Sequence, residues 1–124
     1  MSNPLQLAPV VLVLGRNQPV AISARKPSQV AGDRFRPVPD TGLTIVALLS
    51  TSSGVGAAAI HASLQITLTE VTAGEYYGEI LGADVTSHLT VYADTETPIY
   101  LVASSGSVQR EVIECRVRSS ALAA

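Results

Sequence analysis

Cross-linking residues, aromatic residues and charge are all scarce in this chain of 124 residues. Its single cysteine, Cys115, excludes an intrachain disulfide and favours a reducing compartment over a small secreted scaffold. With no Trp and one Phe, the core must be built mainly from Val, Leu, Ile and Ala, which suit closely packed sheets. Charged residues make up 15%, against roughly 25% in an ordinary soluble domain. Either other subunits cover part of the surface, or the surface is rich in Ser and Thr.

Residue patterns typical of catalytic and metal sites are also missing. Two histidines and one cysteine cannot supply the four closely spaced ligands of a zinc site. A Ser–His–Asp set could use His88 and Asp84, but no G-x-S-x-G motif singles out a serine. Residues 54–59 match G-x-G-x-x-A, yet an alternating strand follows too soon for the helix of a dinucleotide site. We therefore expect no enzyme activity, no catalytic residue, no metal and no cofactor.

Neither a membrane nor a specific nucleic acid is expected as a partner. The apolar run at 10–14 has no basic residue before it and no small-residue cleavage site after it, unlike a signal peptide. The charge-free stretch 41–69 is interrupted by polar residues 50–54, so two buried strands explain it better than a membrane span. The net charge of −2 and the absence of an aromatic stacking platform argue against specific nucleic-acid binding.

Alternation of apolar and polar residues predicts an all-β fold. Short strands separated by turn signals favour an immunoglobulin-like β-sandwich, with a small β-barrel as the alternative. We expect one domain over residues 1–124, with 119–124 as a flexible tail. Residues 57–63 could be strand or short helix. The expected strands are 10–14, 20–23, 43–49 (buried on both faces), 64–71, 75–81, 89–93, 99–103 and 108–118.

The expected strand at 75–81 illustrates how side chains are assigned to faces. Its alternation turns Tyr76, Gly78 and Ile80 to one side and Glu75 and Glu79 to the other. Two acids alternating on a strand are more typical of a solvated face than of a catalytic carboxylate pair. We interpret Glu75 and Glu79 as candidate acceptors for basic groups of a neighbouring subunit.

Residues 25–40 have a different composition. Pro27, Pro37 and Pro39 exclude a helix and discourage a strand, so we expect an extended arm or long loop. One interpretation is an arm that docks on a neighbour, with an apolar anchor and arginines that pair with carboxylates. The other is a solvated loop whose Phe tucks under its own domain. The candidate interface residues of the arm are Arg25, Lys26, Arg34, Phe35 and Arg36.

Charges are sorted along the chain. Residues 1–36 carry five basic groups and one acid, whereas residues 37–109 carry seven acids and no base. A basic arm on an acidic body is an arrangement that self-complementary ring or lattice subunits can use to set register. Pairing of the arm with its own body is the competing explanation.

Three segments together resemble a known class of protein. They are Thr72–Ile80 (TAGEYYGEI), Ile99–Val102 (IYLV) and Val112–Val117 (VIECRV). Over roughly residues 60–118 the chain is similar to small immunoglobulin-like virion proteins of tailed bacteriophages. The absence of a core Trp and of a Cys pair departs from an antibody-type domain.

This resemblance implies a non-enzymatic virion subunit, made in the host cytoplasm: a head–tail junction (neck) protein, a tail component or a capsid decoration (cement) protein. Its partners would be copies of itself in a ring or lattice and other virion proteins. Two alternatives stay open. One is a soluble ligand-binding or adhesion module that uses loops 50–56 and 94–98; the other is an enzyme that depends on His88 or Asp84.

Overall fold

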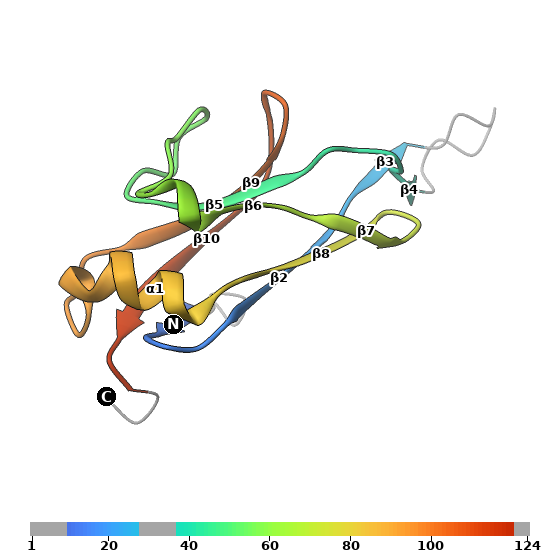
Figure 1. Ribbon diagram of the computed structural model, residues 1–124. Helices are drawn as coiled ribbons and strands as arrows, with labels where there is room; N and C mark the ends of the chain where they lie inside the picture. Colours follow the sequence, from blue (N-terminus) through green and yellow to red (C-terminus); the bar gives the residue numbers. More distant parts are fainter. Residues whose placement is uncertain (1–9, 28–36, 121–124) are drawn as a thin grey trace, which may run out of the picture.

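The computed structural model describes residues 10–27 and 37–120 (Figure 1). The described residues form mainly β-strands, as the alternation predicted. The strands are β1 (Val10–Val13), β2 (Gln18–Ser23), β3 (Arg25–Pro27), β4 (Pro37–Pro39), β5 (Val46–Ser50), β6 (Gln65–Thr67), β7 (Thr69–Thr72), β8 (Glu75–Ile80), β9 (Ile99–Ser105) and β10 (Val108–Arg118). The helices are η1 (Ala62–Leu64), α1 (Gly82–Leu89) and η2 (Thr90–Tyr92), of which η1 and η2 are 3₁₀ turns.

The strands form one large and two small sheets. The five-stranded sheet has the order β1-β10-β9-β5-β6; its β1–β10 pair is parallel and the others are antiparallel. The three-stranded sheet has the order β2-β8-β7, and β3 pairs with β4 in a two-stranded ribbon. Chain connections join both edges of the large sheet to the three-stranded sheet, because β1 leads into β2 and β6 into β7. The large sheet therefore curls like half of a barrel (Figure 1).

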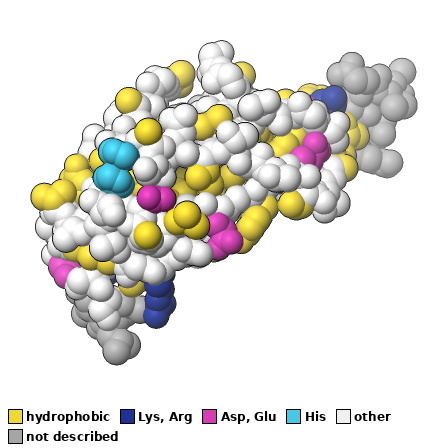
Figure 2. Space-filling view, viewed as in Figure 1, with side chains coloured by type: hydrophobic (Ala, Val, Ile, Leu, Met, Phe, Trp, Pro, Cys, Tyr) yellow, Lys and Arg dark blue, Asp and Glu magenta, His cyan; other side chains and the backbone are white. Residues whose placement is uncertain are grey.

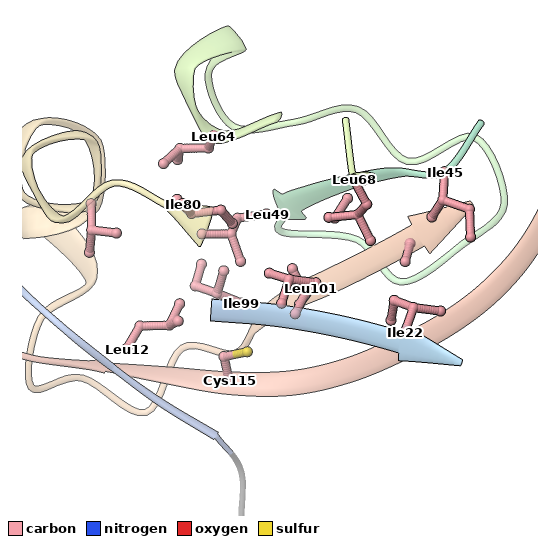
Figure 3. Packing of buried hydrophobic residues seen from close by; sticks show 14 of the residues in the cluster. Leu12, Ile22, Ile45, Leu49, Leu64, Leu68, Ile80, Ile99, Leu101 and Cys115 are labelled. Carbon is pink, nitrogen blue, oxygen red and sulfur yellow. The ribbon is translucent and has the colours of Figure 1, made fainter. Parts of the chain in front are cut away.

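The hydrophobic core lies between the inner faces of these sheets. Figure 3 shows Leu12, Ile22, Leu49, Ile99 and Cys115 converging from five strands. Alternation correctly predicted the inward residues of β8, where Tyr76 and Ile80 are buried. Cys115 and Val117 are likewise buried on β10. The apolar residues of β5 divide between two environments. Ala47 and Leu49 are buried in the core, while Val46 and Leu48 are half-buried on the outer face.

The prediction of a strand at 89–93 is wrong, because α1 and η2 occupy residues 82–92. Val85 and Leu89, four residues apart, bury one face of α1. The start of α1 is set by distant residues: the Gly82 N–H donates to Asn17 Oδ1 (2.8 Å), and a Cβ on Gly82 would overlap the backbone of Gly15. Within the described ranges, no helix is long and apolar enough to cross a membrane.

The single strand predicted over 64–71 is also corrected. It begins as η1, becomes β6 in the large sheet, and continues as β7 in the three-stranded sheet. The change of sheet occurs at Leu68, whose N–H donates to Ile45 O (2.8 Å) and whose side chain is buried. Leu64 and Leu68 are both buried, so the alternation of apolar residues continues across the change of sheet.

Candidate functional site

The candidate arm residues fall partly within the described structure. Arg25 and Lys26 lie on β3 with their side chains exposed. Arg34, Phe35 and Arg36 lie outside the described residues. Figure 1 shows the β3–β4 ribbon at one end of the molecule, opposite the end that carries α1.

The prolines do not prevent β3 and β4 from pairing. Asp40 N donates to Ala24 O (2.9 Å), which makes Ala24 and Asp40 a hydrogen-bonded pair. In an antiparallel ladder such pairs alternate with non-hydrogen-bonded ones. By this alternation the next pair, Arg25↔Pro39, takes a non-hydrogen-bonded position, and Lys26↔Val38 takes a hydrogen-bonded one. The last pair, Pro27↔Pro37, is again at a non-hydrogen-bonded position. Each proline therefore sits where no N–H is needed, which the sequence-based expectation overlooked.

The base of the ribbon is fastened to the three-stranded sheet. Ala24 N donates to Gly74 O (2.8 Å) in the β7–β8 turn. The buried Tyr76 donates its hydroxyl to Asp40 O (2.7 Å) and accepts from Leu43 N (3.1 Å). These bonds hold residues 40–43, which follow β4, against β8.

Glu70 on β7 provides a second attachment. Its carboxylate accepts from Gly74 N (2.9 Å) and from Gly42 N (3.0 Å), so it bridges the β7–β8 turn and the chain that leaves the ribbon. Those two backbone hydrogen bonds, led by Gly74, lower the pKa of Glu70. Sequence reasoning counted Glu70 only as one acid of the body, since its partner Gly42 is 28 residues away.

The ion pairs found among residues 10–27 and 37–120 involve arginines of β10. Arg110 Nη2 lies 3.4 Å from Asp40 Oδ2, which adds a link from the large sheet to the ribbon base. Arg116 and Arg118 pair with Glu114 (2.8 Å) and Glu96 (3.6 Å), respectively. Among the described residues, no ion pair joins Arg25 or Lys26 to a carboxylate.

The candidate acceptors lie on the outer face of the three-stranded sheet, as predicted. Glu75 is half-buried and accepts a hydrogen bond from Ser23 Oγ (2.8 Å) on the neighbouring strand. Glu79 and Tyr77 are exposed on the same face. Glu79 is opposite Pro19, toward the end of β8 farther from the ribbon. The structure thus leaves Glu79 the freer of the two carboxylates.

A groove of about 490 Å³ lies on the outer face of the large sheet. Its floor comes from β5 and β9, where the register pairs Val46 with Ser104 and Leu48 with Val102. The 51–61 loop and the β9–β10 hairpin rise beside this face (Figure 1). The lining residues, none of them ionisable, are Thr44, Val46, Leu48, Gly56, Ala57, Gln65, Val102, Ser104 and Gly106.

The two loops considered for ligand binding start from the same end of the large sheet, because Ser50 pairs with Tyr100. Residues 50–56 border the groove through Gly56. The turn at 94–98 is tied down instead: Asp94 accepts from Ser119 N (3.1 Å) and Ser119 Oγ (2.6 Å). The Ser119 bonds lower the pKa of Asp94. Of the expected flexible tail, Ser119 is held in this way, and residues 121–124 lie outside the described ranges.

His88 and Asp84 lie one helical turn apart on α1, but no hydrogen bond joins them within the described structure. His88 stacks instead on His61, which precedes η1; the ring centroids are 3.6 Å apart and the ring planes 12°. Described residues hold no cluster of three or more metal-ligating side chains. Sequence reasoning had not predicted the histidine pair, whose members are far apart in the chain.

No protein-family model matches this chain, and a search of curated proteins found no match.

Proposed function

We propose that the protein is a non-enzymatic structural subunit of a tailed-phage particle, located in the neck or a related ring or lattice. Sequence motifs within residues 60–118 resemble those of immunoglobulin-like virion proteins, and this resemblance suggests the class of particle. Capsid decoration is the close alternative. The observation that carries the proposal is the ribbon: Arg25 and Lys26 are exposed on a firmly anchored element and are unpaired with any described carboxylate.

Anchoring at the base favours a contact role over a solvated loop. The hydrogen bonds of Ala24, Tyr76 and Glu70 fix the direction in which β3 and β4 leave the body. A fixed direction lowers the conformational entropy lost when the arm docks on a neighbour. The short, proline-bearing ribbon is also poorly suited to unspecific edge pairing.

Charge complementarity supplies the acceptor. Glu79 is exposed on the outer face of the three-stranded sheet and has no basic partner among the described residues. An arm from a second copy that lies across this face would bring basic side chains to Glu79. Glu75, which accepts a hydrogen bond from Ser23, would add a second negative charge to the contact. Repetition of this head-to-tail contact closes a ring or extends a lattice.

A charge-swap series tests this contact. Size would be measured by mass photometry and sedimentation, for the chain alone and with virion fractions. Lys26→Glu and Glu79→Lys should each weaken assembly, and the double variant should restore part of it. Glu111→Lys is a matched control, because Glu111 is exposed on β10 in the other sheet and, like Glu79, makes no ion pair among the described residues. Monomers under every condition would rule out the proposal.

A loop replacement tests the arm as a whole. Because Pro27 and Pro37 are register partners at the end of the ribbon, a short Gly/Ser linker can replace residues 28–36 and still join β3 to β4. The shortened protein should unfold at the same denaturant concentration as the wild type but fail to assemble. Unchanged assembly would contradict a role for the arm.

The groove favours a second candidate, a ligand-binding or adhesion module. Its uncharged lining, with an apolar floor and a few polar groups, is typical of small apolar-ligand sites. Ser104→Trp would fill the groove. Under this alternative Ser104→Trp loses ligand-induced thermal stabilisation, and replacement of 28–36 leaves that stabilisation intact. Under the first proposal Ser104→Trp still assembles, and the protein with 28–36 replaced does not.

A further inference from the structure

The stacked histidines connect two segments that are distant in the sequence. His61 ends the 51–61 loop, and His88 lies in the last turn of α1. Figure 2 shows the two imidazoles side by side at the surface, drawn in cyan, and they are the two histidines of the chain. Their centroid separation of 3.6 Å and their near-parallel planes are a close face-to-face contact.

Buried leucines follow each ring in the sequence. Leu64 ends η1 and Leu89 ends α1, and both are fully buried in the core. Ile60 N, next to His61, donates to Leu49 O (2.9 Å) and so fixes the loop to β5. The ring stack therefore lies over the junction between η1 and α1, and separation of the rings would loosen that junction.

The hydrogen bond at His61 defines its uncharged form. His61 Nδ1 accepts from Ser63 N (3.1 Å), which caps η1, so the ring proton is on Nε2. The doubly protonated ring has a hydrogen on Nδ1 and can no longer accept this bond. Protonation of His61 thus removes the cap of η1.

Few charged groups are available to offset protonation of the pair. Residues 57–64 carry no ionisable side chain except His61. On α1 and η2, the ionisable groups besides His88 are Asp84 and Tyr92, and β1 and β6, which border this region, carry none. Asp84 can balance one positive charge, but a second charge faces the first across 3.6 Å.

We propose that the His61–His88 stack is a pH-sensitive clasp that holds the 57–64 segment against α1 when neutral and releases it on acidification. One proton is compatible with stacking, because a cationic ring can lie over a neutral one. Two protons place like charges in contact and break the η1 cap. Histidine is the side chain whose charge changes between pH 5 and 8, so release is tested across this range.

Release has a consequence for the groove. Gly56 and Ala57 line the groove, and Ala57 belongs to the segment that the clasp holds. Acidification therefore opens the outer face of the large sheet on that side. This inference is independent of the proposed virion role.

Hydrogen exchange of the full chain, read by mass spectrometry, tests the clasp. Protection would be compared at pH 7.5 and pH 5.5 after correction for the pH dependence of intrinsic exchange. We expect protection of 57–64 to fall about fivefold at the lower pH, the factor for like charges in contact near water. The peptide that covers β10 should keep its protection and serves as the internal reference.

Two variants each remove one of the two titrating rings. His61→Asn retains a cap acceptor for Ser63 N, and His88→Phe retains a flat ring. In His61→Asn the protection of 57–64 should become independent of pH in this range. In His88→Phe only the part of the response that comes from loss of the η1 cap should remain, because His61 still accepts a proton at Nδ1. Equal protection of the wild type at both pH values would overturn the proposal, as would a pH response that persists in the double variant.

A measurement on the wild type alone guards against misfolded variants. Because the chain has two histidines, their ring protons are easily assigned by NMR. A nuclear Overhauser contact between the rings should be present at pH 7.5 and lost at pH 5.5. Its persistence at pH 5.5 would overturn the clasp.

Discussion

The hydroxyl of Tyr76 donates a 2.7 Å hydrogen bond to the carbonyl oxygen of Asp40 and accepts one from Leu43 N. Tyr76→Phe keeps the ring but leaves both backbone groups without this partner. We expect a loss of about 1–3 kcal/mol in the free energy of unfolding, measured by urea denaturation. Proteolysis between β4 and β5 should accelerate. Tyr77→Phe, at an exposed neighbouring position, is the control and should change neither quantity.

Gly74 cannot carry a side chain without displacing the ribbon base. Its φ is +76°, and a Cβ would lie 2.8 Å from Pro39 Cβ and 2.9 Å from Ala24 O. Gly74→Ala therefore combines backbone strain with a clash against backbone. Gly106→Ala is the matched control, because its φ is +59° but nothing lies within 4 Å of the added Cβ.

The comparison separates the two effects. Gly106→Ala should lower the free energy of unfolding, measured by urea denaturation, by about 1 kcal/mol through its backbone conformation alone. Gly74→Ala should lower the free energy of unfolding by clearly more than this. It should also weaken assembly, because the added methyl group displaces the base of the arm. Equal costs for the two variants would show that the contact with Pro39 relaxes freely.

Acid should weaken the attachment made by Glu70. Its pKa is lowered in the folded protein, so its contribution to stability is present above its ordinary value of 4.5 and is lost as the pH falls through the lowered pKa. Glu70→Gln should lower the urea midpoint at pH 6, and the two midpoints should converge at acidic pH. A constant difference across the range would contradict the role of the charge.

Cys115 should resist thiol reagents in the folded state. It is fully buried, and desolvation raises its pKa to about 11, so at neutral pH almost none of it is thiolate. Modification by a disulfide reagent should therefore follow global unfolding and show the same denaturant dependence. Fast labelling of native protein would indicate local opening of β10 next to β1.

Local alternation was sufficient to predict much of the sheet. The strands at 75–81 and 108–118 match β8 and β10 closely, because residues 75–80 and 113–118 alternate and each strand follows a turn that contains a glycine, Gly74 or Gly106. α1 escaped prediction for a different reason. Its β-branched residues favour strand locally, and the groups that start it, Asn17 and Gly15, are more than 60 residues away.

The candidate site was predicted only in outline. Composition identified an extended basic segment, and β3 bears its first two basic residues. The anchors of that segment are Glu70, Tyr76 and Asp40, which reach it through long-range hydrogen bonds that leave no periodic trace in the sequence. The same limit applies to the histidine stack and to the groove, since both need the sheet register to bring their residues together.

The run of β2 into β3, interrupted by Ala24 alone, decides how a mechanical load on the arm would travel. A neighbour pulling on the ribbon pulls along the axis of β2, whose six register pairs with β8 extend from Gln18 to Ser23. Hydrogen bonds in an antiparallel ladder lie across the strand direction, so tension loads them together in shear. The arm is thus connected to its body in the orientation that resists force best.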